Sequence, residues 1–208
     1  APKEPIRNTL SLTLNDENNE IIGETEVSVD FKNGLSPFSL DLIGQNEKYG
    51  MEVSTVLEDN EKANYTFANN KIIITPAAGK SSSRKYLITY RGIPEKGLVI
   101  DTTKFGQRSF FGDNWPNLAR HWLACVDHPY DKASVEFSIT APAHYDVVTT
   151  GKKIEESYLE NGLKLTRYME SAPVAMKVVT IGVTQFATQL LGTVDGIPVT
   201  AWVYPENR

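Results

Sequence analysis

The sequence is poor in the residues that build disulfides and transition-metal sites: its 208 residues include one cysteine, Cys125, and three histidines. A single thiol excludes an internal disulfide, so the fold depends on its hydrophobic core. No apolar run approaches the roughly 18–20 residues that a membrane-spanning helix needs. The 21 lysines and arginines form no basic stripe, and the formal net charge is -5, which argues against nucleic acid as a partner.

Sequence motifs for two common kinds of chemistry are also missing. The chain has no Gly-x-x-x-x-Gly-Lys loop to cradle a phosphate, and its Ser81-Ser82-Ser83 run has no flanking glycine elbow to expose a nucleophilic serine. Three carboxylates, Asp113, Asp127 and Asp131, raise the alternative of an independent hydrolase that cleaves glycosides. That chemistry needs two carboxylates about 5–10 Å apart, and spacing along the chain does not supply this.

What is present is a normal globular composition, with 40% hydrophobic and 23% charged residues. The length lies between one and two domains at roughly 100–200 residues each, but no linker or repeat divides the chain, so residues 1–208 are predicted to form a single domain. The sequence opens Ala-Pro-Lys-Glu-Pro, without an initiator Met or an apolar signal region. We therefore expect a processed protein that is periplasmic or secreted, with a cytoplasmic location as the alternative.

Apolar residues alternate with polar ones in many short segments, and turn residues separate nearly all of them. This pattern predicts an all-β fold: a sandwich or saddle-like pair of curved, mostly antiparallel sheets with long loops. A hairpin turn is expected at residues 15–19, and short helical turns at 116–126 and, more weakly, at 155–159. The predicted strands cover residues 10–14, 25–31, 38–42, 65–67, 71–75, 86–90, 135–139, 145–150, 163–168, 177–183 and 199–204.

One connection, residues 110–132, gathers two of the three Trp, two of the three His and the only Cys. Arg120 precedes Asp127 by seven residues, so a bidentate ion pair between them would pin the two arms of the loop. The spacing His121-x-x-x-Cys125-x-x-His128 could suggest a metal, but Pro129 directs the chain out of helical geometry. A lone cysteine among aromatics more often packs as a small apolar group, so no metal site is predicted.

Trp115 lies where a strand gives way to this loop, between Asp113-Asn114 and Pro116. An anchored aromatic beside an acid and an amide can form one wall of a ligand pocket, and plain core packing is the alternative. We therefore single out Asp113, Asn114 and Trp115 as candidate substrate-binding residues.

Residues 119–133 read Ala-Arg-His-Trp-Leu-Ala-Cys-Val-Asp-His-Pro-Tyr-Asp-Lys-Ala. This run resembles a motif in the amino-terminal domain of the gluzincin zinc aminopeptidases, the aminopeptidase N and leukotriene hydrolase family; Ala124 replaces the family's usual proline. Further similarities follow in the family's order: Tyr-Leu-Ile-Thr-Tyr-Arg-Gly at 86–92, Pro-Val-Ala-Met at 173–176, and Gly-Ile-Pro-Val at 196–199.

The family removes the first residue of a peptide, using a zinc ion held by His-Glu-x-x-His and a later Glu. Neither that motif nor the family's amine-binding Gly-x-Met-Glu-Asn occurs here. The resemblance therefore implies a non-catalytic cap domain, with no catalytic residue, metal or cofactor of its own. Its expected partners are peptide substrates and the catalytic domain of the same polypeptide, which would carry the zinc and begin just beyond Arg208.

The family also places an acid or amide five residues before the motif arginine, where it reaches the substrate's first residue. That position is Trp115 here, which is a departure from the family pattern. We expect Trp115 to pack against the first side chain of the substrate and Asp113 or Asn114 to face its ammonium group. A free-standing β-sandwich that binds carbohydrate or protein is the alternative function.

Overall fold

The computed structural model describes residues 5–32, 34–79 and 81–208 and consists of β-strands joined by loops. Every helical element in these ranges is a 3-10 turn of three residues. None of the helices described is long or apolar enough to cross a membrane. The all-β prediction is therefore confirmed.

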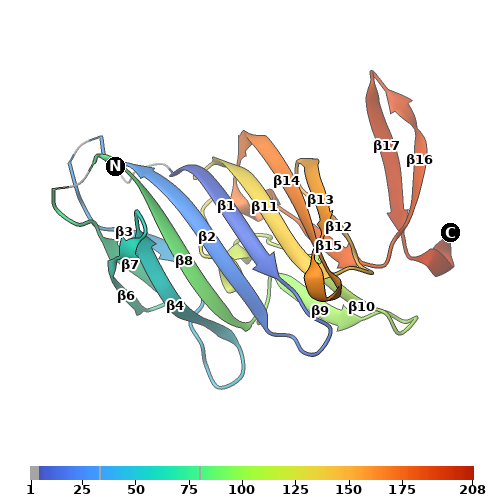
Figure 1. Ribbon diagram of the computed structural model, residues 1–208, viewed down its shortest axis with the longest axis horizontal. Helices are drawn as coiled ribbons and strands as arrows, with labels where there is room; N and C mark the ends of the chain where they lie inside the picture. The colour runs from blue at the N-terminus through green and yellow to red at the C-terminus, as the bar shows by residue number, and fades with distance from the viewer. Residues whose placement is uncertain (1–4, 33, 80) are drawn as a thin grey trace.

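The largest sheet has eight strands in the order β13-β14-β11-β1-β2-β8-β4-β5. All neighbours in it run antiparallel except β1 and β11, which are parallel. In Figure 1 this sheet is a curved surface that crosses most of the molecule. Its strands are β1 (Pro5–Thr13), β2 (Ile21–Asp30), β4 (Gly50–Glu58), β5 (Glu61–Lys62), β8 (Ser83–Ile93), β11 (Ala133–Pro142), β13 (Lys152–Tyr158) and β14 (Leu163–Val174).

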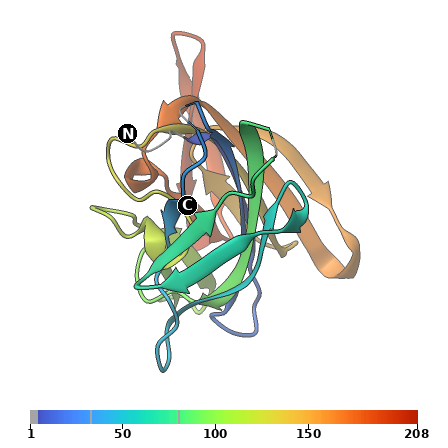
Figure 2. The same cartoon turned by 90° about the vertical axis from the view of Figure 1, so that its left-hand side faces the viewer.

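Three smaller sheets accompany it, with strand orders β12-β15-β10-β9, β3-β7-β6 and β16-β17. The β3-β7-β6 sheet lies at one end of the molecule and the β12-β15-β10-β9 sheet behind the other end, as Figures 1 and 2 show. Their bounds are β3 (Phe38–Asp41), β6 (Asn64–Ala68), β7 (Lys71–Thr75), β9 (Leu98–Thr102), β10 (Arg108–Gly112), β12 (Asp146–Thr149), β15 (Ile181–Thr184), β16 (Ala187–Val194) and β17 (Ile197–Val203).

Strand β8 links the core of the large sheet to the loop at residues 113–132. Its alternate residues Tyr86, Ile88 and Tyr90 are fully buried, as expected for period-two patterning. Gly23 on β2 lies opposite Tyr90, and a Cβ at Gly23 would come within 2.3 Å of the Tyr90 ring. The glycine therefore lets the ring lie across the neighbouring strand. The Tyr90 hydroxyl donates to the Trp122 carbonyl oxygen at 3.0 Å, which fixes the loop above the sheet.

Several local predictions are confirmed by the structure. The β1–β2 turn is held by Asn15, whose Oδ1 accepts the backbone amides of Glu17 at 2.8 Å and Asn18 at 2.9 Å. The helical turn expected within 116–126 is the 3-10 turn Ala119–His121.

Two boundaries differ from the sequence prediction. Residues 155–159 are not helical, because Lys152–Tyr158 pairs as edge strand β13 with β14. The strand expected over 177–183 begins later, at Ile181, because Met176–Val178 forms a 3-10 turn. Strands β4, β9, β10 and β16 were not predicted at all. In β10, Ser109 and Phe110 are buried in succession, and such a segment shows no simple alternation.

Candidate functional site

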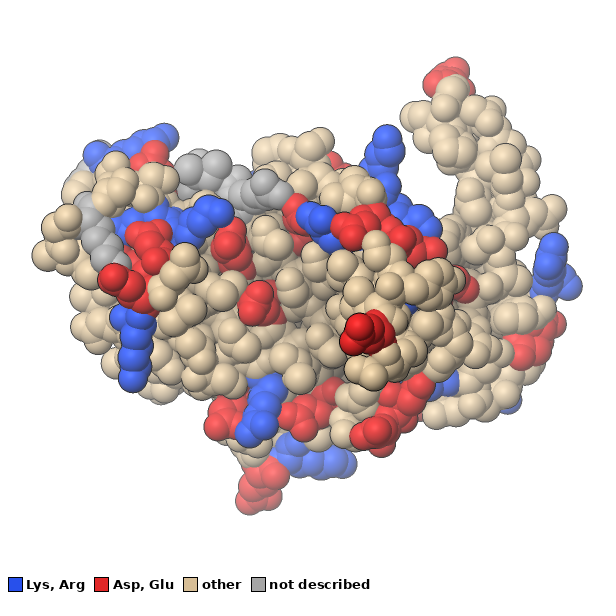
Figure 3. Space-filling view, in the orientation of Figure 1, with Lys and Arg blue, Asp and Glu red and all other residues tan. Residues whose placement is uncertain are grey.

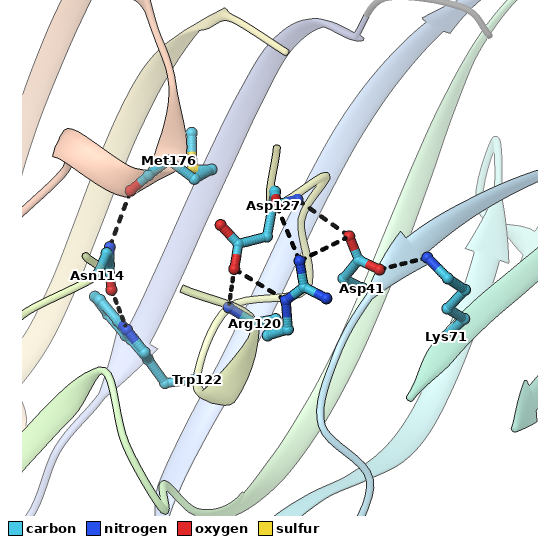
Figure 4. Close-up of polar contacts among 7 residues, drawn as sticks. All are labelled: Asp41, Lys71, Asn114, Arg120, Trp122, Asp127 and Met176. Atoms are coloured by element: carbon cyan, nitrogen blue, oxygen red, sulfur yellow. Dashed lines mark hydrogen bonds and ion pairs between the residues drawn. The ribbon is translucent and has the colours of Figure 1, made fainter. Parts of the chain in front are cut away.

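The connection between β10 and β11, residues 113–132, is irregular in backbone but closely held, and we call it the central loop. Its Asn114 side chain is 2% exposed and faces inward. Asn114 Nδ2 donates to the Met176 carbonyl oxygen at 3.0 Å, and its Oδ1 accepts Trp122 Nε1 at 2.8 Å (Figure 4). Nδ2 also donates to the Val179 carbonyl oxygen at 2.9 Å. Both donors and the oxygen are thus engaged within the domain, so Asn114 positions the loop and does not face outward.

Trp122 is the large side chain on which the central loop is packed. It is fully buried, and it lies against Gly97, whose φ is +76°. A Cβ at Gly97 would come within 2.2 Å of the Leu118 carbonyl oxygen and 2.9 Å of Trp122 Cδ1. Only glycine fits this backbone angle and this close approach together. The indole, the Asn114 amide and Gly97 therefore fix where the loop leaves β10.

The predicted Arg120–Asp127 contact is present, with a different geometry from the bidentate pair expected. Arg120 Nε lies 3.1 Å from Asp127 Oδ2, and Nη2 donates to the Asp127 carbonyl oxygen at 2.9 Å. The Arg120 backbone amide also donates to Oδ2 at 3.2 Å. The guanidinium therefore spans the side chain and main chain of one residue, and it closes the two arms of the loop as predicted.

Asp41, at the end of β3, was not singled out from the sequence, yet it joins this network (Figure 4). Its Oδ1 accepts Lys71 Nζ at 2.6 Å, and its Oδ2 accepts the Asp127 amide at 3.2 Å and lies 3.8 Å from Arg120 Nη2. The backbones of Asp41 and Cys125 also pair, with N···O distances of 2.7 and 3.2 Å. The small β3-β7-β6 sheet is thereby attached to the central loop.

The possible metal ligands of the loop lie in different environments. Cys125 is 2% exposed, and burial raises the pKa of its thiol well above the ordinary value. His128 is exposed and packs on the Tyr130 ring, with centroids 3.9 Å apart. His121 Nδ1 lies 3.9 Å from Glu95 Oε2, and burial lowers the pKa of its imidazole. Within residues 5–32, 34–79 and 81–208, no three His, Cys, Asp or Glu side chains are grouped to hold a metal.

Asp113 and Trp115 lie on the outer side of the loop. The Trp115 side chain is 64% exposed, and Lys177 Nζ lies 4.9 Å from its ring centroid. Asp113 is exposed; its amide donates to the Gly97 carbonyl oxygen at 2.7 Å, and its Oδ1 accepts the Trp115 amide at 3.3 Å. We call these three residues the Trp115 surface. It presents an indole, a carboxylate and an ammonium group, and Lys177 was not foreseen because it lies far from Trp115 in the sequence.

The other catalytic alternatives find little support in this geometry. Asp127 is buried under Arg120 whereas Asp113 is exposed, so these carboxylates lie in different environments. Ser81, Ser82 and Ser83 are all exposed where the chain enters β8. An open cavity of about 430 Å³ lies elsewhere, lined by residues of the 44–53 and 67–70 segments. None of the predicted site residues lines it.

Comparison with known proteins identifies the family to which this domain belongs. The peptidase M1 N-terminal domain family matches residues 4–175, most of the chain. The chain belongs to this family. The match includes the whole central loop and strand β8, so the resemblance that the 119–133 motif indicated is confirmed.

Individual relatives cover different parts of the chain. It is 29% identical over 96 residues to glutamyl aminopeptidase of Rattus norvegicus, a stretch that spans 46% of this chain and 10% of that protein. An M1 zinc metallopeptidase from Deinococcus radiodurans, solved with a Tyr-Ser-Ala substrate, has a TM-score of 0.76 at 20% identity, covering 95% of this chain and 46% of that one. Native leukotriene A4 hydrolase from Saccharomyces cerevisiae has a TM-score of 0.79 at 20% identity, covering 99% and 32%. The M1 domain thus spans less than half the length of each of these proteins.

Proposed function

We propose that this M1 N-terminal domain is the non-catalytic domain of a zinc-dependent aminopeptidase, where it caps the catalytic domain and helps to shape the pocket for the substrate's amino-terminal residue. The observation that carries the proposal is the family match over residues 4–175. The solved neighbours support it, because nearly the whole chain fits within proteins more than twice as long.

The domain would supply no zinc ligand in this arrangement. Its thiol at Cys125 is buried in the core, none of its three histidines lies four residues from another, and it has no His-Glu-x-x-His pair. Zinc bound by the catalytic domain of the same polypeptide would activate the attacking water. The contribution of this domain is therefore to hold the substrate and exclude solvent.

The Trp115 surface is the part that we propose meets the substrate. Its indole can pack against the first side chain of a peptide, and the Asp113 carboxylate can accept hydrogen bonds from the free ammonium group. The contacts of Asn114 and Arg120 keep the loop in one conformation, which lowers the entropy lost on binding. The Deinococcus metallopeptidase with its Tyr-Ser-Ala substrate supports peptides as the ligand class.

Kinetics of the longer polypeptide test this role. Trp115→Ala and Asp113→Asn should each lower kcat/KM about tenfold or more, corresponding to roughly 1.4 kcal/mol of transition-state stabilisation, with a different ratio for Ala, Leu and Arg substrates. Tyr130→Ala and Asp101→Asn are the matched controls, because both residues are exposed and lie outside the Trp115 surface. Unchanged kcat/KM for Ala, Leu and Arg substrates in Trp115→Ala and Asp113→Asn would show that the Trp115 surface does not line the substrate pocket.

The alternative function is a free-standing module that binds carbohydrate or protein. The reading frame after Arg208 distinguishes it from the peptidase domain. An open reading frame that continues past Arg208 into His-Glu-x-x-His supports the peptidase domain, and a stop codon at that point supports the binding module. This observation is independent of the kinetic test.

A further inference from the structure

The Lys177 ammonium group takes no part in the contacts proposed above for the peptide substrate. Lys177 is half-buried, and its Nζ lies 4.9 Å from the centroid of the exposed Trp115 ring. A cation over an indole is attracted to the negative face of the ring, which keeps the ammonium on this surface. Among the residues that the structure describes, neither Lys177 nor Asp113 has an ion-pair partner. The two opposite charges of the Trp115 surface are therefore available to a ligand.

The position of Lys177 is set by the same buried amide that holds the central loop. Lys177 lies in the 3-10 turn Met176–Val178, and the buried side chains of Met176 and Val179 anchor the turn on both sides. Asn114 Nδ2 donates to the carbonyl oxygen of Met176, as Figure 4 shows, and to that of Val179. Asn114 is also the chain neighbour of the other two residues of the Trp115 surface. One side chain thus fixes the backbone at all three positions.

A further contact joins the two segments that carry these residues. Thr180 Oγ1 donates to the Gly112 carbonyl oxygen at 2.8 Å, and strands β10 and β15, which begin or end at these segments, pair side by side. The chain that follows Lys177 therefore runs next to the chain that leads into the central loop. Groups that are held in place before binding lose little conformational freedom when a ligand arrives.

The charge of the domain as a whole does not favour acidic ligands. The formal net charge is -5, and Figure 3 shows lysines and arginines interspersed with aspartates and glutamates over the face in view. A net negative charge repels anions at long range, and salt screens this field over about 10 Å. Selectivity for a negatively charged side chain would therefore depend on a cation in direct contact with it.

We propose that Lys177 makes the longer polypeptide selective for peptides whose first residue has a carboxylate side chain; this inference rests on the proposed function. Such a residue carries an ammonium group and a carboxylate that are joined by a short aliphatic chain. Asp113 can accept hydrogen bonds from the ammonium, the Trp115 indole can pack on the aliphatic part, and Lys177 can donate to the carboxylate. A neutral side chain would forfeit the charge-assisted hydrogen bond to Lys177.

Glu and Gln substrates of the longer polypeptide test this role, because the two first side chains have nearly the same shape and differ in charge. The unchanged protein should cleave the Glu substrate with a kcat/KM about tenfold or more above that for the Gln substrate. Lys177→Gln should lower this ratio to about one, and Lys177→Glu should reverse it in favour of Gln. Lys177→Arg should preserve the ratio, because a guanidinium also donates to a carboxylate.

Lys48→Glu is the matched control for charge. Lys48 Nζ also lies 4.9 Å from an aromatic centroid, that of its neighbour Tyr49, and it is outside the Trp115 surface. The net charge changes as much as in Lys177→Glu, so the Glu-to-Gln ratio should stay as it is in the unchanged protein. A fall equal to that in Lys177→Glu would show that overall charge sets the selectivity, and it would overturn the proposal.

A Glu-to-Gln ratio at or below one in the unchanged protein would also overturn the inference, as would a ratio that Lys177→Gln leaves as it is. Asp113→Asn separates this failure from a failure of the proposed function. If Asp113→Asn lowers kcat/KM for both substrates while Lys177→Gln does not change the ratio, only the role of Lys177 is rejected. If Trp115→Ala and Asp113→Asn affect neither substrate, the proposed pocket role of the surface is rejected, and this inference with it.

Discussion

The central loop and the β16–β17 hairpin differ in opposite ways in their regular secondary structure and in the burial of their side chains. The loop has almost no regular secondary structure, yet Asn114, Trp122 and Asp127 are buried and hydrogen-bonded to distant segments. The hairpin has a regular ladder of backbone hydrogen bonds, yet nearly all of its side chains lie in solvent.

The difference shows that regular secondary structure and burial are separate properties. Buried polar groups hold the loop because each unpaired donor or acceptor would carry a desolvation penalty. The hairpin depends on local turn chemistry at Asp195-Gly196, and Trp202 at its base packs against the Phe186 ring. The comparison predicts that changes in the loop destabilise the domain strongly, whereas changes at the exposed positions of the hairpin have little effect on its stability.

The largest effect is expected from Asn114→Ala. The substitution leaves two buried groups without the partners that they have now, the Trp122 indole N–H and the Val179 carbonyl oxygen, and the Met176 carbonyl oxygen keeps only the Val179 amide. At about 1–3 kcal/mol for each unpaired group, with some relaxation, the free energy of unfolding should fall by about 3–5 kcal/mol. Urea unfolding measures this value. Asn117→Ala, an exposed neighbour in the same loop, is the control and should change it by less than about 0.5 kcal/mol.

Gly97→Ala should follow in size. The new Cβ would overlap the Leu118 carbonyl oxygen, in a backbone region with φ at +76°, so we expect a loss of about 2–4 kcal/mol. Gly106→Ala separates the two causes, because Gly106 has a similar φ of +83° with nothing within 4 Å of its Cβ position. It should cost only the backbone term, about 1 kcal/mol. Equal losses in the two variants would mean that close packing at Gly97 does not hold the loop.

A pH-dependent effect should distinguish His121 from His128. Burial, partly opposed by Glu95, lowers the pKa of the His121 imidazole below its ordinary value of 6.5. The unfolded chain therefore binds a proton at a higher pH than the folded protein does, so this contribution to stability is complete above about pH 6.5 and is lost as the pH falls below it. Chemical unfolding between pH 7.5 and 5 should show a smaller loss of stability for His121→Gln than for the unchanged protein. An identical pH profile for His121→Gln and the exposed control His128→Gln would contradict this assignment.

The smallest effect is expected on the hairpin of residues 1–208 alone. Ile197→Lys and Thr200→Lys both replace exposed side chains, so each should change the free energy of unfolding by no more than about 0.5 kcal/mol. A loss above about 2 kcal/mol for Ile197→Lys would show that the Ile197 side chain is buried in this domain, and the comparison between loop and hairpin would no longer hold.

Sequence patterns predicted the all-β class because strands such as β2 and β8 alternate buried and exposed residues, and Asn15 marked its turn through short-range chemistry. They missed β10 and misjudged β13, where burial in the sheet and pairing with β14 override local preference. The Arg120–Asp127 contact was accessible because its partners are close in sequence. Asp41 and Lys177 were not, since nothing local shows that they reach the central loop.

Zinc content and peptidase activity of residues 1–208 test the central claim most directly. After dialysis against metal-free buffer, we predict no stoichiometric zinc and no release of amino-terminal residues from Ala, Leu or Arg peptides, because residues 1–208 contain no His-Glu-x-x-His pair to hold the metal and supply the general base. One zinc ion per chain, together with aminopeptidase activity that a chelator abolishes, would contradict the account.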